Sequence, residues 1–268
     1  MHIIDRGSGI PVVMVPGIQG RWEWMSPGVD ALAERHRVLT FSLGDAAGDD
    51  AWFDRWVRLI DRRLDDAGIE SATIAGVSFG GLIAIRYAAR RPSRVRRLVL
   101  ASTPSPRYRL DPRQELHLRH PLLTFPLFLA GAIGRVSPEI FAARPRWTSR
   151  LQLGAEYGWR TVRARFNPPL MREWVRAWTS TDLTADCAQV TAPTLVITGE
   201  PGLDRVVRVA STLELLDFIP HARHTVLQGT GHVGIITKPR EFASLLTETS
   251  ALTGTTPGVA SFSDAHAS

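Results

Sequence analysis

A serine, a carboxylate and a histidine follow three predicted strands in that order, and these residue types together could transfer an acyl group. The serine is Ser78, which stands between Gly76 and Gly80 in the stretch GVSFGG. The carboxylate is Asp204, and the histidine is His232 in a glycine-flanked loop near the C-terminus. A serine hydroxyl is a weak nucleophile at neutral pH, so it needs a base, and the base needs a carboxylate that orients it. The residue types and their order therefore predict nucleophilic catalysis by Ser78.

The Gly-x-Ser-x-Gly match indicates a nucleophile because it lies between a predicted strand and a predicted helix. By itself the pattern occurs by chance in roughly one chain in ten of this length. Here it follows the apolar run 71–77 and leads into the helical pattern 80–92, as a nucleophile on a strained strand-to-helix turn requires. Side chains at positions 76 and 80 would collide with neighbouring backbone, which explains both glycines. The positive end of the following helix would stabilise an oxyanion.

Two nearby carboxylates could orient His232. Both lie in the stretch PTLVITGEPGLD, where Glu200 follows Gly199 directly and Asp204 comes five residues after that glycine. The residues alone leave the choice open among Asp204, Glu200 and a carboxylate elsewhere in the chain.

An oxyanion hole requires two backbone N–H groups. One donor is expected from Phe79, the residue that follows Ser78. The other is expected from Ile18 in the loop VPGIQG, where Gly17 allows a sharp turn. Trp22 and Trp24 come soon after this loop, and they either line a substrate pocket or pack as ordinary core.

Six apolar runs predict buried strands, and helical patterns separate them. Most of these runs are continuously apolar and rich in β-branched residues, as expected for strands covered on both faces. The runs comprise residues 11–15, 37–43, 71–77, 96–102, 193–199 and 224–229. Helices are expected over residues 49–68, 80–92 and 240–252. The alternation predicts an α/β fold with a mostly parallel central sheet and helices on both faces.

The segment 104–187 breaks this alternation, because it is helical in pattern and carries clustered prolines. It holds 13 arginines and 7 acidic residues, so it accounts for the whole net charge of +6. We expect a helical lid (cap) insertion here. Residues 1–103 and 188–252 would then form the α/β core, and residues 253–268 a disordered tail.

Within the expected lid, residues 121–134 form an apolar run that is too short for a membrane span. The favoured interpretation is packing of the lid on the sheet. A hydrophobic substrate channel and contact with a membrane surface are the alternatives.

The composition argues against several other classes of protein. The single cysteine, Cys187, cannot form an internal disulfide, and no metal-ligand cluster surrounds it, so we expect neither a metal nor a cofactor. We expect a small-molecule substrate and no nucleic-acid partner, because the excess positive charge is confined to one segment. Neither a signal peptide nor a run of about 18 apolar residues is evident, so we expect a cytoplasmic protein without stable membrane insertion. The oligomeric state stays open.

Four stretches of this chain resemble the α/β-hydrolase superfamily, and the resemblance covers about residues 3–250. The matching stretches are VMVPGIQG, GVSFGG, PTLVITGEPGLD and GTGHVGIITKPREFASLL. The resemblance implies an α/β-hydrolase fold with a helical lid. It also implies that Ser78 is the nucleophile, that His232 is the general base and then the acid, and that Asp204 is the orienting carboxylate.

The sequence departs from the superfamily pattern at two places. Pro16 stands where many relatives have a histidine before the loop glycine, a mild departure because the oxyanion hole uses only backbone groups. Asp204 lies two or three residues farther from the strand than the acid of most relatives, and Arg208 stands just beyond it where relatives often have proline.

The resemblance implies a serine hydrolase that cleaves an ester, lactone or thioester of a small, partly apolar acid through an acyl-enzyme intermediate. A C–C bond hydrolase, an acyltransferase and a perhydrolase use the same residues, and a non-catalytic small-molecule sensor could retain them. Related dehalogenases and epoxide hydrolases use an aspartate nucleophile, so the serine at position 78 argues against both.

Overall fold

The structure, a computed structural model, describes residues 4–143 and 167–251. A seven-stranded sheet runs through its centre in the order β1-β3-β2-β4-β5-β6-β7. Neighbouring strands are parallel except at one edge, where β1 pairs antiparallel with β3. The sheet confirms the predicted fold class. Its strands are β1 (Ile4–Arg6), β2 (Ile10–Val15), β3 (His36–Thr40), β4 (Ala72–Val77), β5 (Val95–Ala101), β6 (Thr194–Thr198) and β7 (Arg223–Val226).

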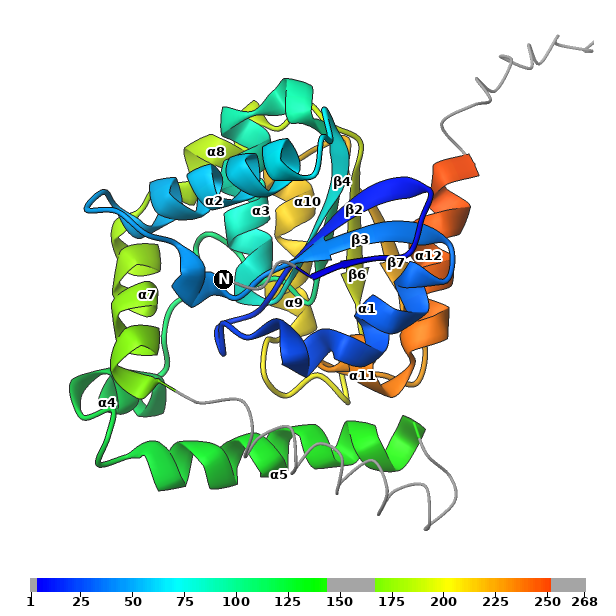
Figure 1. Ribbon diagram of the computed structural model, residues 1–268. Coiled ribbons are helices and arrows are strands. Elements are labelled where there is room, and N and C mark those ends of the chain that lie inside the picture. Colours follow the sequence, from blue (N-terminus) through cyan, green and yellow to red (C-terminus); the bar gives the residue numbers. More distant parts are fainter. Residues whose placement is uncertain (1–3, 144–166, 252–268) are drawn as a thin grey trace, which may run out of the picture.

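Helices cover both faces of the sheet (Figure 1). One face carries α2 (Trp52–Asp66), α3 (Phe79–Arg90) and α8 (Leu183–Gln189), and the other carries α1 (Ser26–Ala33), α11 (Gly234–Thr237) and α12 (Pro239–Ala251). Side chains of β2 alternate between the two faces: Val13 and Val15 join the first layer, whereas Val12 and Met14 join the second. Burial on both sides explains the continuous apolar runs.

All six predicted strands are present, and α2, α3 and α12 confirm the three predicted helices, with ends that differ by a few residues. The runs 224–229 and 37–43 each extend three residues beyond their strands, since β7 ends at Val226 and β3 ends at Thr40. Ser42 and Asp45 form a capping box there and turn the chain into a short 3-10 helix. Strand β1 and helix α1 were not predicted. With only three residues, β1 is too short to show an alternating pattern.

Short helices complete the connections. The segment between β6 and β7 contains α9 (Val209–Leu213) and α10 (Leu215–Phe218). The described 3-10 helices are Trp22–Met25, Leu43–Asp45 and Pro92–Arg94.

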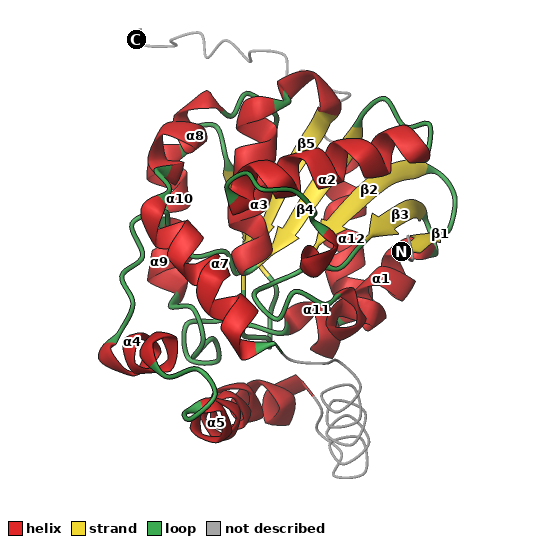
Figure 2. Cartoon of the chain, turned by 60° about the vertical axis from the view of Figure 1, so that its left-hand side comes forward, coloured by secondary structure: helices red, strands yellow, loops and turns green. Residues whose placement is uncertain are grey.

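The segment predicted to be a lid contains α4 (Pro112–Arg119), α5 (Phe125–Ala143), α7 (Pro168–Ser180) and α8. Helices α4, α5 and α7 lie on the side of the sheet to which the parallel strands point (Figure 2). In contrast, α8 packs on α3, and its Cys187 is a core residue, so the predicted boundary after Cys187 falls inside this helix. Burial raises the pKa of the Cys187 thiol to about 12, with help from Asp186 and Asp182. Residues 144–166 of the predicted lid and the predicted tail lie outside the described residues.

Helix α5 contacts the core through only part of its length. The favoured interpretation of the run 121–134, packing on the sheet, is wrong, because Leu123 and Leu127 are 79% and 69% exposed. Contact with α11 comes from the second half of α5, where Val136 and Glu139 are buried on one face. Residues 121–134 come before Val136 along the chain, so their side chains do not reach the sheet.

By length and composition, α5 could cross a membrane: it has 19 residues with a mean hydropathy of 1.2. It is the only helix in the described ranges with this property. One such helix is weak evidence of a membrane span. Its buried Glu139 also interacts with the loop before α11, which ties this end of the helix to the core.

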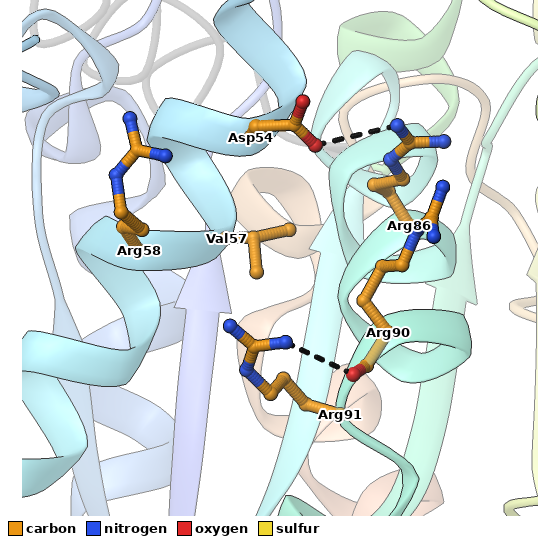
Figure 3. A pocket seen from close by; sticks show the side chains of 6 residues that line it. All are labelled: Asp54, Val57, Arg58, Arg86, Arg90 and Arg91. Atoms are coloured by element: carbon orange, nitrogen blue, oxygen red, sulfur yellow. Dashed lines mark hydrogen bonds and ion pairs between the residues drawn. The ribbon is translucent and has the colours of Figure 1, made fainter. Parts of the chain in front are cut away.

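A cavity of about 350 Å³ opens between α2 and α3, on the outer surface of the helix layer (Figure 3). Arg86, one of its lining residues, donates to Asp186 at 2.8 Å and to Asp54 at 3.3 Å. Two other lining arginines are paired too: Arg91 Nε lies 2.8 Å from Asp61, and Arg58 pairs with Asp50. The cavity is therefore a largely neutralised network of ion pairs. Its lining residues are Asp54, Val57, Arg58, Arg86, Arg90 and Arg91.

We expect Arg86→Met to lower the free energy of unfolding by about 3 kcal/mol, because it leaves the Asp186 carboxylate buried without its counter-ion. The Asp186 side chain is 2% exposed, whereas that of Asp54 is 46% exposed. The matched variant Asp54→Ala should therefore cost less than about 1 kcal/mol. Urea unfolding measures both changes, and equal losses would contradict this difference between the two pairs.

Candidate active site

Ser78 occupies the sharp turn between β4 and α3, with φ of 54° and ψ of −125°. A positive φ is strained for a residue with a side chain. The flanking glycines allow the turn, as predicted. A Cβ at Gly76 would lie 2.4 Å from the carbonyl oxygen of Gly80, and one at Gly80 would lie 2.3 Å from that of Val15. The local sequence thus lets the chain present the Ser78 hydroxyl at the end of a buried strand.

The structure brings Ser78, His232 and Asp204 together. Nε2 of His232 lies 3.0 Å from Oγ of Ser78, although 154 residues separate them in the chain. Nδ1 of His232 lies 3.3 Å from Oδ2 of Asp204. The side chains of His232 and Asp204 are 10% and 1% exposed, so this chain of contacts lies mostly out of water. The imidazole can take a proton from the hydroxyl while the carboxylate holds the other ring nitrogen.

Asp204 is held as an anion by its surroundings. Its Oδ1 accepts hydrogen bonds from the backbone N–H groups of Val206 and Val207, at 3.1 and 3.0 Å. Burial alone would raise the pKa of this carboxyl. Attraction to His232 and the hydrogen bonds from His232, Val207 and Val206 outweigh burial, so the pKa of Asp204 lies below its usual value. An ionised Asp204 favours the tautomer in which Nδ1 of His232 carries the proton.

Glu200, the alternative acid, occupies a different position. Its Oε1 accepts a hydrogen bond of 2.6 Å from the backbone N–H of Gly229, and its own N–H donates to the carbonyl of Thr230 at 2.8 Å. Glu200 thus ties the loop after β6 to the loop that carries His232. The two loops interlock closely, since a Cβ at Gly231 would lie 2.4 Å from the carbonyl oxygen of Leu203.

The two predicted oxyanion donors belong to backbone next to Ser78. Phe79 is the first residue of α3, so its N–H has no acceptor within the helix. Ile18 follows Gly17, where a Cβ would lie 3.5 Å from Cβ of Ser78. The Phe79 side chain is 3% exposed and packs against the ring of Trp56, with centroids 5.5 Å apart. Phe79 can therefore contribute through its backbone while its ring belongs to the core.

Trp22 and Trp24 lie in the 3-10 helix that follows the same loop. The guanidinium of Arg6 lies 5.4 Å from the centre of the Trp22 ring, and Trp24 is 6% exposed. Neither residue lines the cavity of about 10 Å³ beside His232, which has room for about one water molecule.

Two tryptophans of α7 lie near the site and were not predicted. A Cβ at Gly20, two residues after Ile18, would lie 2.4 Å from the ring of Trp174. The ring of Trp178 lies 6.2 Å from that of Phe79. A signal was present, because Leu170, Trp174 and Trp178 recur every four residues, as on one face of a helix.

Within residues 4–143 and 167–251, no three His, Cys, Asp or Glu side chains form a cluster that could hold a metal ion. The chemistry available at Ser78 comes from its hydroxyl, the imidazole, the carboxylate and backbone N–H groups.

Comparison with known proteins gives a match to the alpha/beta hydrolase fold over residues 10–239. A 2-hydroxymuconate semialdehyde hydrolase from Pseudomonas sp. (strain CF600) is 29% identical over 277 residues, covering 91% of this chain and 88% of that protein. A pimeloyl-acyl-carrier protein methyl ester esterase from Nitrosomonas europaea is 27% identical, with coverage of 91% and 97%. The enol-lactonase structure from Burkholderia xenovorans LB400 has a TM-score of 0.71 at 21% identity, with coverage of 93% and 96%.

We expect Gly80→Ala to lower the free energy of unfolding by about 2 kcal/mol, because the new methyl group must displace the backbone at Val15. Gly134→Ala is the matched control: Gly134 lies in α5, and a Cβ there would meet no heavy atom within 4 Å. The control should raise stability by up to about 1 kcal/mol, since alanine favours a helix. Thermal unfolding tests both. A Gly80→Ala protein as stable as the wild type would show that the turn is not tightly packed.

Proposed function

The chain belongs to the alpha/beta hydrolase fold family, and on this basis we propose that it is a serine hydrolase. Its substrate would be an ester, lactone or thioester of a small, partly apolar acid. The observation that carries the proposal is the position of His232, within hydrogen-bonding distance of Ser78 and 3.3 Å from Asp204. Acyl transfer to serine requires a nucleophile that contacts a base, and a carboxylate that orients the base from its other side.

In the acylation step, Oγ of Ser78 attacks the carbonyl carbon while its proton passes to Nε2 of His232. The electron pair of the carbonyl double bond moves to the oxygen, where the N–H groups of Ile18 and Phe79 stabilise the negative charge. When the intermediate collapses, the bond to the leaving oxygen or sulfur breaks. His232 gives its proton to the leaving group, and Asp204 stabilises the imidazolium in between.

In the deacylation step, water takes the place of the leaving group. His232 removes a proton from the water as its oxygen attacks the acyl carbon, and the same two N–H groups hold the second oxyanion. The bond to Oγ of Ser78 then breaks, and His232 returns the proton to Oγ. The acid leaves and the enzyme is regenerated without a cofactor.

We also propose that α4, α5 and α7 form a lid over this site. Support comes from contacts on either side of Ser78: Trp174 of α7 packs on the loop that contains Ile18, and Glu139 of α5 contacts the loop that carries His232. Access of substrate to Ser78 would then depend on how these helices lie.

A second candidate function is hydrolysis of a carbon–carbon bond next to a carbonyl. It is favoured by the similarity to the 2-hydroxymuconate semialdehyde hydrolase, which extends over 91% of this chain. Attack by Ser78 would be the same, but the leaving atom would be a carbon and would need a proton. An oxygen or sulfur leaving group departs more readily than a carbanion. Cleavage of an ester or thioester therefore requires less stabilisation of the leaving group by the described residues.

We expect Ser78→Ala and Asp204→Asn each to lower kcat for p-nitrophenyl acetate by at least about 1,000-fold, because these residues act as one unit with His232. The matched control is Glu200→Gln, which keeps an oxygen able to accept from Gly229. It should retain activity within about tenfold, given the modest cost of altering one hydrogen bond. If Glu200→Gln lost as much activity as Asp204→Asn, the assignment of the acid would be wrong.

The two candidate functions predict opposite orders of kcat/KM for an ester and for a carbon–carbon bond substrate. We expect kcat/KM for p-nitrophenyl butyrate to exceed kcat/KM for 2-hydroxy-6-oxo-2,4-heptadienoate, because the phenolate leaves more readily than carbon. Absorbance assays follow release of p-nitrophenol and loss of the dienol. Ser78→Ala should abolish whichever reaction is observed, and the reverse preference would favour the carbon–carbon hydrolase.

A further inference from the structure

Glu139 is a buried carboxylate that the proposed mechanism does not use. It belongs to α5, outside the strand–helix alternation that supplies Ser78, Asp204 and His232, and it is 0% exposed. It lies three residues after the buried Val136, on the face of α5 that contacts α11. A buried carboxylate is costly to keep unless specific partners bind it.

The partners of Glu139 all belong to the segment that follows His232 or directly precedes it. Its Oε2 accepts a hydrogen bond of 2.9 Å from the backbone N–H of Val233, the residue next to His232. Its Oε1 accepts a bond of 2.8 Å from the hydroxyl of Thr237 in α11. The backbone N–H of Gly231, on the other side of His232, also stabilises the charged carboxylate. Glu139 thus holds the backbone directly after the catalytic imidazole and the end of α11.

Glu139 and His232 also attract each other electrostatically. Burial raises the pKa of the Glu139 carboxyl above its usual value, and the donors from Val233, Gly231 and Thr237, together with attraction to His232, counteract part of this rise. Asp204 is attracted to His232 as well. Two carboxylates from separate elements therefore act on the imidazole, Asp204 by direct contact and Glu139 through the loop and its charge. The neutral hydroxyl of Ser78 faces Nε2.

We propose that Glu139 is a positioning residue, which fixes the loop of His232 from the predicted lid and so keeps the imidazole within reach of Ser78 and Asp204. The inference rests on the proposed function, because it assigns to Glu139 a part in the same proton transfer. If Glu139 acts in this way, the distance between His232 and Ser78 depends on how α5 packs against α11. Displacement of α5 would take both carboxylate oxygens of Glu139 away from the backbone N–H of Val233 and the hydroxyl of Thr237.

The test compares Glu139→Gln with the matched control Glu173→Gln, which neutralises an exposed carboxylate on α7. Glutamine keeps the volume of Glu139 but replaces one acceptor oxygen by an N–H₂ group that faces donors. We expect kcat for p-nitrophenyl acetate to fall about tenfold with little change in KM, the size expected for weakening one charge-assisted hydrogen bond. Glu173→Gln should leave both constants unchanged.

Rescue by a carboxylate separates positioning from a purely structural role. Glu139→Asp keeps the charge that accepts hydrogen bonds from Val233 and Thr237, so it should recover part of the kcat lost in Glu139→Gln. A kcat in Glu139→Gln equal to that of the wild type would overturn the proposal.

Hydrogen exchange tests the positioning role without any turnover of substrate. Hydrogen exchange of the backbone over residues 228–238 should be faster in Glu139→Gln than in the wild type or in Glu173→Gln. If Glu139→Gln does not fold, Thr237→Val removes one donor and keeps the charge. We then expect faster exchange and about threefold lower kcat. Exchange and kcat that both match the wild type would refute the role of Glu139.

Failure of the proposal and failure of the proposed function give different results. A wild-type protein whose esterase activity equals that of Ser78→Ala refutes the hydrolase function, and the exchange experiment then still tests whether Glu139 holds the loop. An active wild type with an unaltered Glu139→Gln refutes the positioning role alone.

Discussion

The arrangement of this protein depends on one imidazole that must reach two partners at once. His232 lies 3.0 Å from the hydroxyl of Ser78 and 3.3 Å from the carboxylate of Asp204. The three residues come from loops that follow β4, β6 and β7, whose carboxyl ends meet at one edge of the parallel sheet. A shift of about 1 Å in any of these loops would disturb proton transfer. Much of the surrounding structure can be understood as holding these loops in place.

Close backbone packing is the means by which the loops are held. The turn at Ser78 lies against β2, and the loop of His232 lies against the loop of Asp204, at distances that a side chain at Gly80 or Gly231 would prevent. The positive φ at Ser78 and the buried charge on Asp204 each cost free energy. Burial of β4 within the sheet and of α3 against it offsets such costs, because β4 is wholly buried and α3 buries most of its residues.

The helices between β5 and β6 differ in what they contribute. Helix α8 joins the core through Leu183 and Cys187. Helix α7 places Trp174 on the loop after β2, and α5 places Glu139 on the loop of His232. The remaining surface of α5 exposes large apolar side chains such as Leu127. Contacts from this segment therefore reach loops on two sides of the candidate site, which gives the proposed lid a physical connection to the proposed chemistry.

The amino-acid sequence by itself determined the α/β class, the six parallel strands and the turn at Ser78, because these depend on local patterns. Apolar runs predict buried strands, and the glycines around Ser78 reflect contacts within a few residues of chain or with the adjacent strand. The family resemblance implied Asp204 as the acid, but the residues by themselves left Glu200 open, and the tertiary structure decided which carboxylate meets His232. Glu200 and Asp204 lie four residues apart in one loop, and only the path of that loop turns Asp204 toward the ring and Glu200 toward Gly229. The same holds for Glu139 and for the exposure of residues 121–134, since partners far away in the chain determine burial, and local sequence does not specify them.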